Sequence, residues 1–357
     1  MSRMPEVGDV VDDVFRIESE LDHGNFGSVY RVEDTLEKRT LALKVLKPGP
    51  HDEDELRQRF EREARLIYSL RHRHVLRVYY YGETESGLPY MAIKYLKGTD
   101  LKTLLRHHGS LNPKLTKRIS LETLSALEAA HELGIVHRDL KPANVFLVND
   151  GARGHVKVLD FGFAKALEDD RNPDLTAAKT LVGTPAYMAP ELVHKEDVGP
   201  PADIYAMGLI MAEMLTGEKL VQIDSVYDTI LYQGSEKPIR LPDEVGESPF
   251  SSIIERAIRK DTDERYETAT DMSLDLEALE LADGQRATSS TDDVPTEFGE
   301  ADEDDMTKPA SHGLPAIHEV DAEMVAESGG GDSIDPFADF PEYDEVPEDA
   351  TTNQRSD

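Results

Sequence analysis

One short region constrains the fold of this 357-residue chain more than any other. It is the polar stretch His137–Asn144, which reads His-Arg-Asp-Leu-Lys-Pro-Ala-Asn, followed by Asp160 sixteen residues after Asn144. Between them lie two apolar runs, 145–148 and 156–159, joined by turn-forming residues that include two glycines. This pattern predicts an antiparallel β-hairpin. Because a hairpin folds back on itself, we expect Asn144 and Asp160 to lie side by side.

The side chains that this hairpin brings together are suited to a hard metal ion. An amide oxygen next to a carboxylate is a ligand pair typical of Mg²⁺ rather than of zinc. Asp139 lies five residues before Asn144, and we expect it to act as a base or an orienting group beside the metal. The region therefore predicts metal-assisted phosphoryl transfer.

Composition and charge exclude several other classes of function. The chain has no cysteine, so disulfides, thiolate metal sites and a cysteine nucleophile are excluded. Its net charge is −33, of which −19 falls on residues 283–357 and −14 on residues 1–282. Nucleic-acid binding needs clustered lysine and arginine, so we expect none. No apolar signal segment and no run of the ~20 apolar residues that span a membrane is visible, and we expect a cytoplasmic protein.

The first third of the chain reads as an antiparallel sheet with one helix. Residues 1–13 form a short leader. Alternating apolar residues then predict five strands, and the segment 54–70 has apolar residues at helical spacing. Two of the predicted strands contain the residues 15–17 and 29–32, and the other three span 41–46, 75–81 and 89–96.

Two features of this sheet are compatible with phosphate binding, and each has a simpler interpretation. Gly24 and Gly27 between the first two strands would let a backbone approach phosphates closely, although most such connections are plain hairpin turns. Lys44 lies inside the apolar third strand and is either an outward-facing edge lysine or a buried cation. A buried lysine requires a counter-charge. Glu63 on the predicted helix could supply it, unless Glu63 belongs to the solvated face of that helix.

From residue 97 the pattern becomes mostly helical and continues to about residue 282. The clearest helix is Leu115–Leu133, which has apolar residues at helical spacing and is ended by Gly134. Residues 283–357 are rich in acidic and small residues and predict a disordered acidic tail. Within the tail, the segment 335–343 mixes aromatic and acidic residues. This segment either docks in a basic groove of a partner or only keeps the tail solvated.

Taken together, these motifs, with Asp160-Phe161-Gly162 and the segment Gly183–Glu191, resemble those of the eukaryotic-type (Hanks-type) serine/threonine protein kinases. The resemblance covers residues 14–282 and is closest to the bacterial members. It implies an α+β, bilobal protein-kinase fold: a five-stranded antiparallel N-lobe with one main helix (14–96) and a mostly helical C-lobe (97–282). It also implies ATP, Mg²⁺ with Mn²⁺ as an alternative, and protein substrates.

The resemblance implies a role for each matching residue. Asp139 would orient the substrate hydroxyl and accept its proton, and Lys141 would contact the γ-phosphate. Asn144 and Asp160 would hold the metal ion. Thr184 would bond to Asp139 and Lys141, which narrows the acceptor to serine and threonine hydroxyls. The nucleotide-binding residues would be Leu21, Gly24, Gly27, Val29, Ala42, Lys44, Glu63, Ile93, Lys94, Leu96, Asp100, Phe146 and Asp160.

The resemblance also implies a regulatory switch. Arg138 would bind a phosphorylated residue of the activation loop, for which Thr176 and Thr180 are the candidates and Thr176 is preferred. We therefore predict activation by autophosphorylation. The chain departs from the family at Asp22, which stands where the first glycine usually lies. Its carboxylate either repels the nucleotide or points to solvent, and we expect the second. His72-Arg73-His74 also replaces the usual His-Pro-Asn, which should affect a turn and not the chemistry.

Two structural contacts and two alternative functions complete these expectations. Asp203 would anchor the backbone of the catalytic stretch, and Glu191 would pair with Arg265. A nucleotide-binding scaffold without catalysis is disfavoured because every catalytic position is intact. A kinase for small molecules would not require the segment 183–191, so its presence disfavours that alternative.

Overall fold

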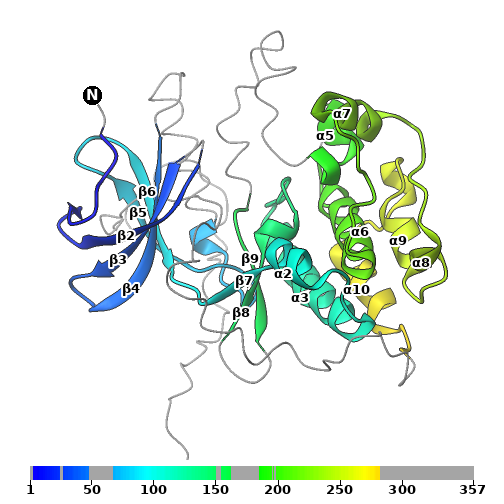
Figure 1. The fold of residues 1–357 in the computed structure, drawn as a ribbon, viewed down its shortest axis with the longest axis horizontal. Coiled ribbons are helices and arrows are strands. Elements are labelled where there is room, and N and C mark those ends of the chain that lie inside the picture. The colour runs from blue at the N-terminus through cyan, green and yellow to red at the C-terminus, as the bar shows by residue number, and fades with distance from the viewer. Residues whose placement is uncertain are drawn as a thin grey trace, which may run out of the picture. The chain divides into compact units, whose positions relative to one another are not determined.

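The structure, a computed structural model, describes residues 3–24, 27–47, 67–149, 154–161, 185–194, 196 and 198–281. These residues all belong to one compact unit, Met1–Ile317. In this part of the chain the large sheet comes first and the helices follow, as Figure 1 shows. The acidic tail and almost all of the helix predicted over 54–70 lie outside the described residues.

The N-lobe is a six-stranded antiparallel sheet with the strand order β1-β2-β3-β4-β6-β5. The strands are β1 (Val10–Val11), β2 (Phe15–His23), β3 (Gly27–Asp34), β4 (Arg39–Leu46), β5 (Val78–Glu83) and β6 (Pro89–Lys94). The last five correspond to the five predicted strands, so the predicted count of five is one too low.

The additional strand β1 comes from the predicted leader. Asp12 and Asp13 both have left-handed backbone conformations, with φ of 54° and 57°, and turn the chain back so that Val11 pairs with Phe15. The phenolic hydroxyl of Tyr90 donates to the Asp12 carboxylate at 2.6 Å, and Val11 joins the apolar cluster around Phe15. Apolar burial and this hydrogen bond hold part of the leader on the sheet.

The two faces of the sheet have different roles because side chains alternate along each strand. On the outer face, Tyr30, Leu43 and Ala92 lie opposite one another on β3, β4 and β6 and belong to a separate apolar cluster. The next row along the strands, Val29 and Lys44, points to the other face, which we call the site face. The lysine of β4 therefore points away from the outer cluster.

A second, three-stranded sheet contains the predicted hairpin. Its strands, in the order β7-β8-β9, are β7 (Gly98–Asp100), β8 (Val145–Val148) and β9 (His155–Val158). β8 and β9 pair antiparallel, with Val145 opposite Val158. Beyond that pair, the N–H of Leu159 donates to the carbonyl of Asn144 at 2.8 Å. The prediction that Asn144 and Asp160 lie side by side is confirmed.

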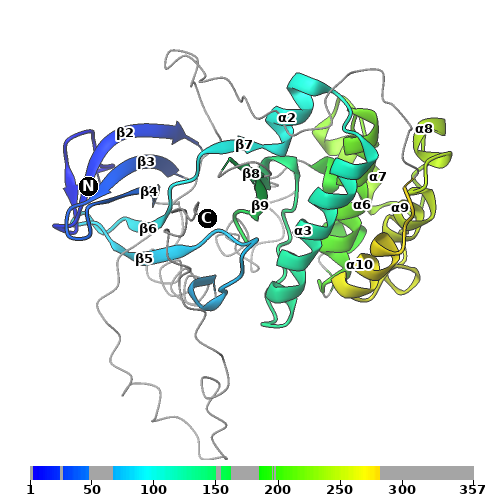
Figure 2. The same cartoon turned by 90° about the horizontal axis from the view of Figure 1, so that it is seen from below.

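Helices make up most of the C-lobe, on the far side of the hairpin from the large sheet in Figure 2. The described α-helices are α2 (Leu101–His108), α3 (Pro113–His131), α5 (Pro190–His194), α6 (Pro201–Thr216), α7 (Val226–Gly234), α8 (Asp243–Gly246), α9 (Ser251–Ala257) and α10 (Ala269–Glu277). Short 3₁₀ turns are η1 (Pro142–Asn144), η2 (Pro185–Tyr187) and η3 (Thr262–Glu264).

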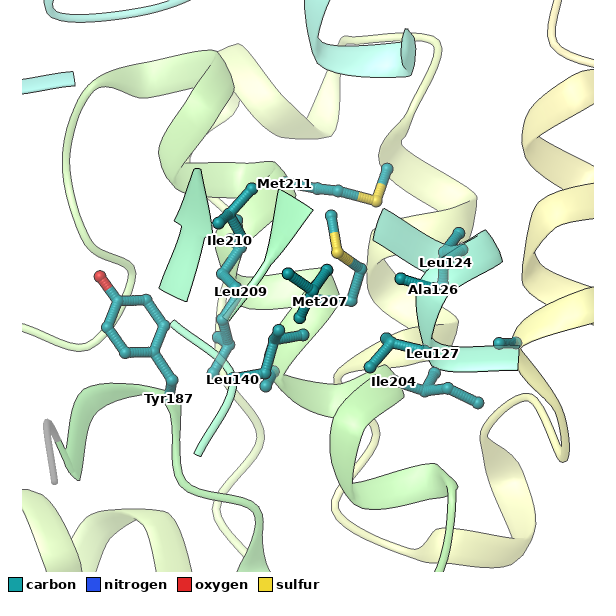
Figure 3. Close-up of a cluster of buried hydrophobic side chains, with 14 of the residues drawn as sticks. Leu124, Ala126, Leu127, Leu140, Tyr187, Ile204, Met207, Leu209, Ile210 and Met211 are labelled. Atoms are coloured by element: carbon teal, nitrogen blue, oxygen red, sulfur yellow. The ribbon is translucent and has the colours of Figure 1, made fainter. Parts of the chain in front are cut away.

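Helix α6 is the centre of the C-lobe core. It is buried on every side, which its apolar composition allows, and it ends at Gly217, whose left-handed φ of 77° is typical of a helix C-terminus. Figure 3 shows Met207 and Ile210 of α6 in one cluster with Leu127 of α3. Helix α3 matches the predicted buried helix. No helix in the described part of the chain is long and apolar enough to cross a membrane.

Candidate functional site

One buried carboxylate fixes the backbone at the start of the predicted catalytic stretch, His137–Asn144. Asp203, near the start of α6, accepts hydrogen bonds from the N–H groups of His137 and Arg138, each at 2.8 Å. Oδ2 of Asp203, which accepts from the His137 N–H, also accepts from Nε2 of His131 at 2.8 Å. Asp203 is 1% exposed, and a polar group buried to this degree requires hydrogen-bond donors around it. The predicted anchoring by Asp203 is confirmed.

Two residues of the site have left-handed backbone conformations, which residues other than glycine rarely adopt. Arg138 has φ of 62° and Asp160 has φ of 55°. Such conformations cost about 1–3 kcal/mol each and persist only where neighbouring contacts impose them. Here Asp203 holds the Arg138 N–H, and Nε2 of His137 donates to the carbonyl of Leu159 at 2.8 Å. These contacts connect the catalytic stretch directly to the end of β9.

Three of the residues predicted to carry catalysis, Asp139, Lys141 and Asn144, contact one another. Nζ of Lys141 donates to Oδ2 of Asp139 at 2.5 Å. The side-chain amide nitrogen of Asn144 donates to the carbonyl of Asp139 at 2.8 Å. Since the amide nitrogen is used in this way, the amide oxygen of Asn144 is the atom that can bind a metal ion. The carboxylate, ammonium and amide of the predicted site are therefore neighbours.

Lys44 joins this group from the N-lobe. Its Nζ lies 3.0 Å from Oδ1 of Asp160, a residue 116 positions later in the chain. Lys44 is 3% exposed, and burial lowers the pKa of its ammonium to about 8 although the charge of Asp160 opposes the change. The nearby Lys141 lowers the pKa of Lys44 further. Two cations, Lys44 and Lys141, thus lie near each other, and each contacts a carboxylate.

This arrangement fits a divalent metal ion that is shared with a phosphate ligand. Mg²⁺ usually takes one or two carboxylates, phosphate oxygens and water rather than a complete cage of protein ligands. Asp160 supplies a partly exposed carboxylate and Asn144 an amide oxygen. Among the described residues there is no group of three or more histidine, cysteine and acidic side chains that would hold a metal without such a ligand.

Most of the predicted nucleotide-binding residues lie on the N-lobe sheet, on the small sheet or on the segment between them. Val29 is opposite Lys44, and Ala42 is opposite Ile93, in the ladders of the N-lobe sheet. Phe146 of β8 faces Asp100 of β7 across the small sheet. Leu21, Gly24 and Gly27 occupy the end of the β2–β3 hairpin, and Lys94 and Leu96 lead from β6 toward β7.

The glycine loop is restrained by contacts that the sequence did not reveal. A Cβ atom at Gly27 would lie 2.1 Å from the carbonyl oxygen of Val45, so a glycine is required there by the close approach of β4. Lys47 donates to the carbonyl of Gly24 at 2.9 Å and to Nε2 of His23 at 2.9 Å. Lys47 therefore connects the end of β4 to the loop. Its position at the end of a strand was the only signal in the sequence.

Asp100 has a second role that competes with its predicted contact to the ribose. It is the N-cap of α2, where its carboxylate accepts the Thr103 N–H at 2.9 Å and the Thr103 hydroxyl at 2.8 Å. Capping of this kind satisfies a helix N–H group that would otherwise lack a partner. A ribose hydroxyl would share this carboxylate with the helix.

Several predicted residues cannot be placed. Glu63, Thr176, Thr180 and Thr184 lie outside the described residues, so their roles stay predictions. Arg138 is described, and its side chain is exposed.

The expectation for Asp22 is wrong. We expected its carboxylate to point to solvent, but the residue is only 8% exposed. The cause is an irregularity of the β2–β3 ladder, in which Glu20 pairs with Tyr30 while Asp22 pairs with the adjacent Val29. This shift turns Asp22 to the site face.

The segment after residue 184 is attached to the C-lobe by buried polar contacts. Arg265 forms two hydrogen bonds with Glu191, at 2.7 and 2.9 Å, as predicted. Two further contacts were not predicted: the Tyr187 hydroxyl donates to Glu213 of α6, and Gln233 of α7 donates to the carbonyl of Ala186 at 2.7 Å. Glu213 and Gln233 lie in helical patterns that give no sign of these partners.

Comparison with known proteins identifies the architecture. The model of the protein kinase domain family matches residues 15–274. The chain belongs to the protein kinase domain family. The predicted class, an antiparallel-sheet N-lobe and a helical C-lobe, is confirmed.

Two similar curated proteins and one similar solved structure come from bacteria. The chain is 30% identical over 300 residues to the probable serine/threonine-protein kinase PknB of Corynebacterium glutamicum, covering 81% of this chain and 46% of that protein. It is 34% identical over 257 residues to the serine/threonine-protein kinase PknH of Mycobacterium bovis, covering 71% and 42%. The crystal structure of the Mycobacterium tuberculosis PknI kinase domain is similar, with a TM-score of 0.60, 25% identity and coverage of 76% and 98%. The chain spans a little under half the length of these curated relatives.

Proposed function

We propose that this chain transfers the γ-phosphoryl group of ATP to serine and threonine hydroxyls of proteins. The observation that carries the proposal is the contact set around Asp160 and Asp139. Lys44 of the N-lobe reaches Asp160 at 3.0 Å, and Lys141 reaches Asp139 at 2.5 Å. Cations that could bind phosphate oxygens thus lie beside carboxylates suited to a metal ion and to a substrate hydroxyl.

The chemistry follows from these positions. The hydroxyl oxygen of the acceptor would form a bond to the γ-phosphorus while the bond to the β–γ bridging oxygen breaks, releasing ADP. Asp139 would orient the hydroxyl and receive its proton. Lys141, already within hydrogen-bonding distance of Asp139, would neutralise charge on the transferred group. Alignment and charge neutralisation supply most of the acceleration in reactions of this kind.

Lys44, Asn144 and Asp160 would bind the nucleotide and its metal ion. The amide oxygen of Asn144 and the carboxylate of Asp160 would hold Mg²⁺, which when bound neutralises charge on the phosphates. Lys44 would bind the α- and β-phosphates and keep Asp160 in place through the contact at 3.0 Å. Glu63, on the helix predicted from the sequence, remains the proposed second partner of Lys44.

The acceptor class and the regulation rest on the sequence and on the relatives. The proteins PknB and PknH are named as serine/threonine-protein kinases, and Lys141 with the proposed contact of Thr184 agrees with that class. The guanidinium of Arg138 is exposed and forms no ion pair within the residues that the structure describes. A phosphate on Thr176 or Thr180 would supply the anion and activate the kinase.

Two further expectations stay predictions. The segment 335–343 of the tail would contact a basic groove of a partner protein, and the chain would act in the cytoplasm without binding nucleic acid.

A phosphate-transfer assay with matched variants tests the proposal. The full chain, prepared with a phosphatase and freed from it, is incubated with labelled ATP, Mg²⁺ and a generic serine/threonine substrate, and modified residues are mapped. Lys44→Met and Asp139→Asn should each lose roughly a hundredfold to a thousandfold in rate. Lys102→Met removes an exposed lysine of α2 and should keep the wild-type rate.

Two outcomes would contradict the proposed transfer to protein hydroxyls, and a third would contradict only the proposed regulation. Transfer only to small molecules would indicate a different acceptor class. Nucleotide binding without any transfer would indicate a scaffold. Full activity without phosphate on Thr176 or Thr180 would contradict the proposed regulation alone.

A further inference from the structure

A carboxylate lies buried on the face of the sheet that carries Lys44. Asp22 is 8% exposed, and it stands near the end of β2, just before the glycine loop. Nothing in the proposed transfer reaction requires an acid at this position. A buried acid is costly unless its surroundings compensate the charge, so its presence calls for an electrostatic explanation.

An interruption of the strand pairing puts Asp22 on the site face. Glu20 pairs with Tyr30 on the outer face, and two residues later Asp22 pairs with Val29, which is only one residue from Tyr30 on β3. In an uninterrupted ladder Asp22 would share the face of Glu20, because side chains repeat every two residues. The extra residue, Leu21, reverses the face of the side chain that follows it, as β-bulges do.

Asp22 then lies in the same cross-strand row as Lys44, the lysine proposed to bind the nucleotide. Asp22 pairs with Val29, and Val29 pairs with Lys44, so the three residues follow one line across β2, β3 and β4. Directly opposed residues of neighbouring strands project to one face. The carboxylate and the ammonium interact: burial lowers the pKa of Lys44, and Asp22 is among the charges that act to raise it.

This geometry gives the phosphates of a nucleotide a competitor. Lys44 attracts phosphate, whereas a carboxylate on the same face repels it and also attracts Lys44. Both effects oppose the binding of a polyanion, and both grow with the number of its charges. In surroundings where water is largely excluded, such interactions are stronger than at an exposed surface.

We propose that Asp22 is a specificity-determining residue of the nucleotide site, whose buried carboxylate weakens binding in proportion to the phosphate charge of the ligand. The inference rests on the proposed function, because it takes Lys44 to be the phosphate-binding lysine. Asp22 sets the affinity for ATP without taking part in the transfer step.

Nucleotide binding to the full chain tests this role. Affinities for ATP, ADP and adenosine are measured by calorimetry at fixed free Mg²⁺, for wild type, Asp22→Asn and Asp22→Gly. Both variants remove the charge, and the second restores the residue usual in the family. We expect ATP to bind about threefold to tenfold more tightly, equivalent to roughly 0.7–1.4 kcal/mol. The affinity for ADP should increase less, and the affinity for adenosine should not change.

The control is another acid of the same strand. Glu18 pairs with Arg31 at 2.9 Å at the surface, and its side chain is 40% exposed. Glu18→Gln should leave the affinities of all three ligands at the wild-type values. Since the readout is binding, it does not depend on whether the chain transfers phosphate.

Two results would overturn the inference. If Asp22→Asn and Asp22→Gly left ATP affinity unchanged, the carboxylate would have no influence on phosphate. If they weakened all three ligands equally, Asp22 would be a structural support of the loop. Either result would leave the proposed function standing, which fails separately if wild type shows no phosphoryl transfer. A melting temperature for each variant shows whether it is folded, and the variant that remains folded decides the matter.

Discussion

The buried ion pair between Glu191 and Arg265 allows a test of what holds the segment after residue 184 on the C-lobe. The guanidinium is fully buried, with a side-chain exposure of 0%, and that of Glu191 is 4%. Besides two bonds to Glu191, Arg265 donates to the carbonyls of Arg259 at 2.7 Å, Lys260 at 3.0 Å and Pro201 at 3.1 Å. Removal of Arg265 therefore leaves a buried carboxylate and three carbonyls without their donor.

The expected loss of stability can be worked out from these contacts. Breaking a buried ion pair from one side typically costs about 3–5 kcal/mol, because the remaining charge has no partner. Arg265→Met should thus lower the free energy of unfolding by about that amount. For a domain of this size the melting temperature should fall by roughly 6–20 °C, taking about 2–4 °C per kcal/mol.

A double-mutant cycle separates the pair from the rest of the site. Arg265→Met, Glu191→Leu and the double variant are compared with wild type by chemical denaturation. Because the double variant leaves no unpaired charge, it should be more stable than the sum of the two single losses predicts, by at least about 1 kcal/mol. Arg256→Met, which changes an exposed arginine of α9 whose guanidinium stacks on Tyr266, is the control and should lose much less.

Two results would refute this reasoning. A loss below about 1 kcal/mol for Arg265→Met would mean that solvent or another cation reaches Glu191. Strictly additive losses would mean that the two side chains stabilise the fold independently.

Two further predictions concern the N-lobe and its junction with the hairpin. Burial lowers the pKa of His74, whose Nδ1 contacts the Val156 carbonyl at 3.0 Å. As the pH falls below about 6.5, the imidazole therefore takes up a proton more readily in the unfolded chain than in the folded one. The free energy of unfolding should therefore decrease as the pH is lowered from about 6.5, and it should decrease less in His74→Asn. Chemical denaturation at several pH values measures this decrease, and His108→Asn, which changes an exposed histidine, is the control. Gly27→Ala should cost about 1–3 kcal/mol and weaken ATP binding, because its Cβ would lie 2.1 Å from a backbone oxygen. Gly246→Ala, which meets no atom within 4 Å, should be nearly neutral by melting temperature and ATP affinity.

The sequence predicted the centre of the site well because the determinants there are local. The hairpin 145–158 is short, and the pairing of Val145 with Val158 brings the residues that flank it, Asn144 and Asp160, close together. The contact of Lys44 with Asp160 joins residues 116 positions apart and was not predicted, because the sequence suggested only Glu63 as the partner of Lys44.

What could not be predicted depends on register and on distant partners. The burial of Asp22 follows from one extra residue in a ladder, which reverses the face of a side chain and leaves no mark in the alternation of apolar residues. The strand β1 forms because two residues adopt left-handed conformations and Tyr90 supplies a hydrogen bond from another strand. Glu213 and Gln233 find their partners only when α6 and α7 are assembled.

The hydrogen bonds of Asp203 link the catalytic stretch to the cooperative unfolding of the C-lobe. The amides of His137 and Arg138 are held by a side chain of the most deeply buried helix. We expect those amides to exchange with solvent when α6 itself opens, so their protection should approach that of the whole domain. Lys44 is supplied by a different lobe, and its contact with Asp160 can be lost by a local opening. The two sides of the proposed reaction centre therefore differ in the free energy needed to disorder them. Heat or denaturant should abolish the proposed nucleotide binding before it disturbs the backbone of residues 137 and 138.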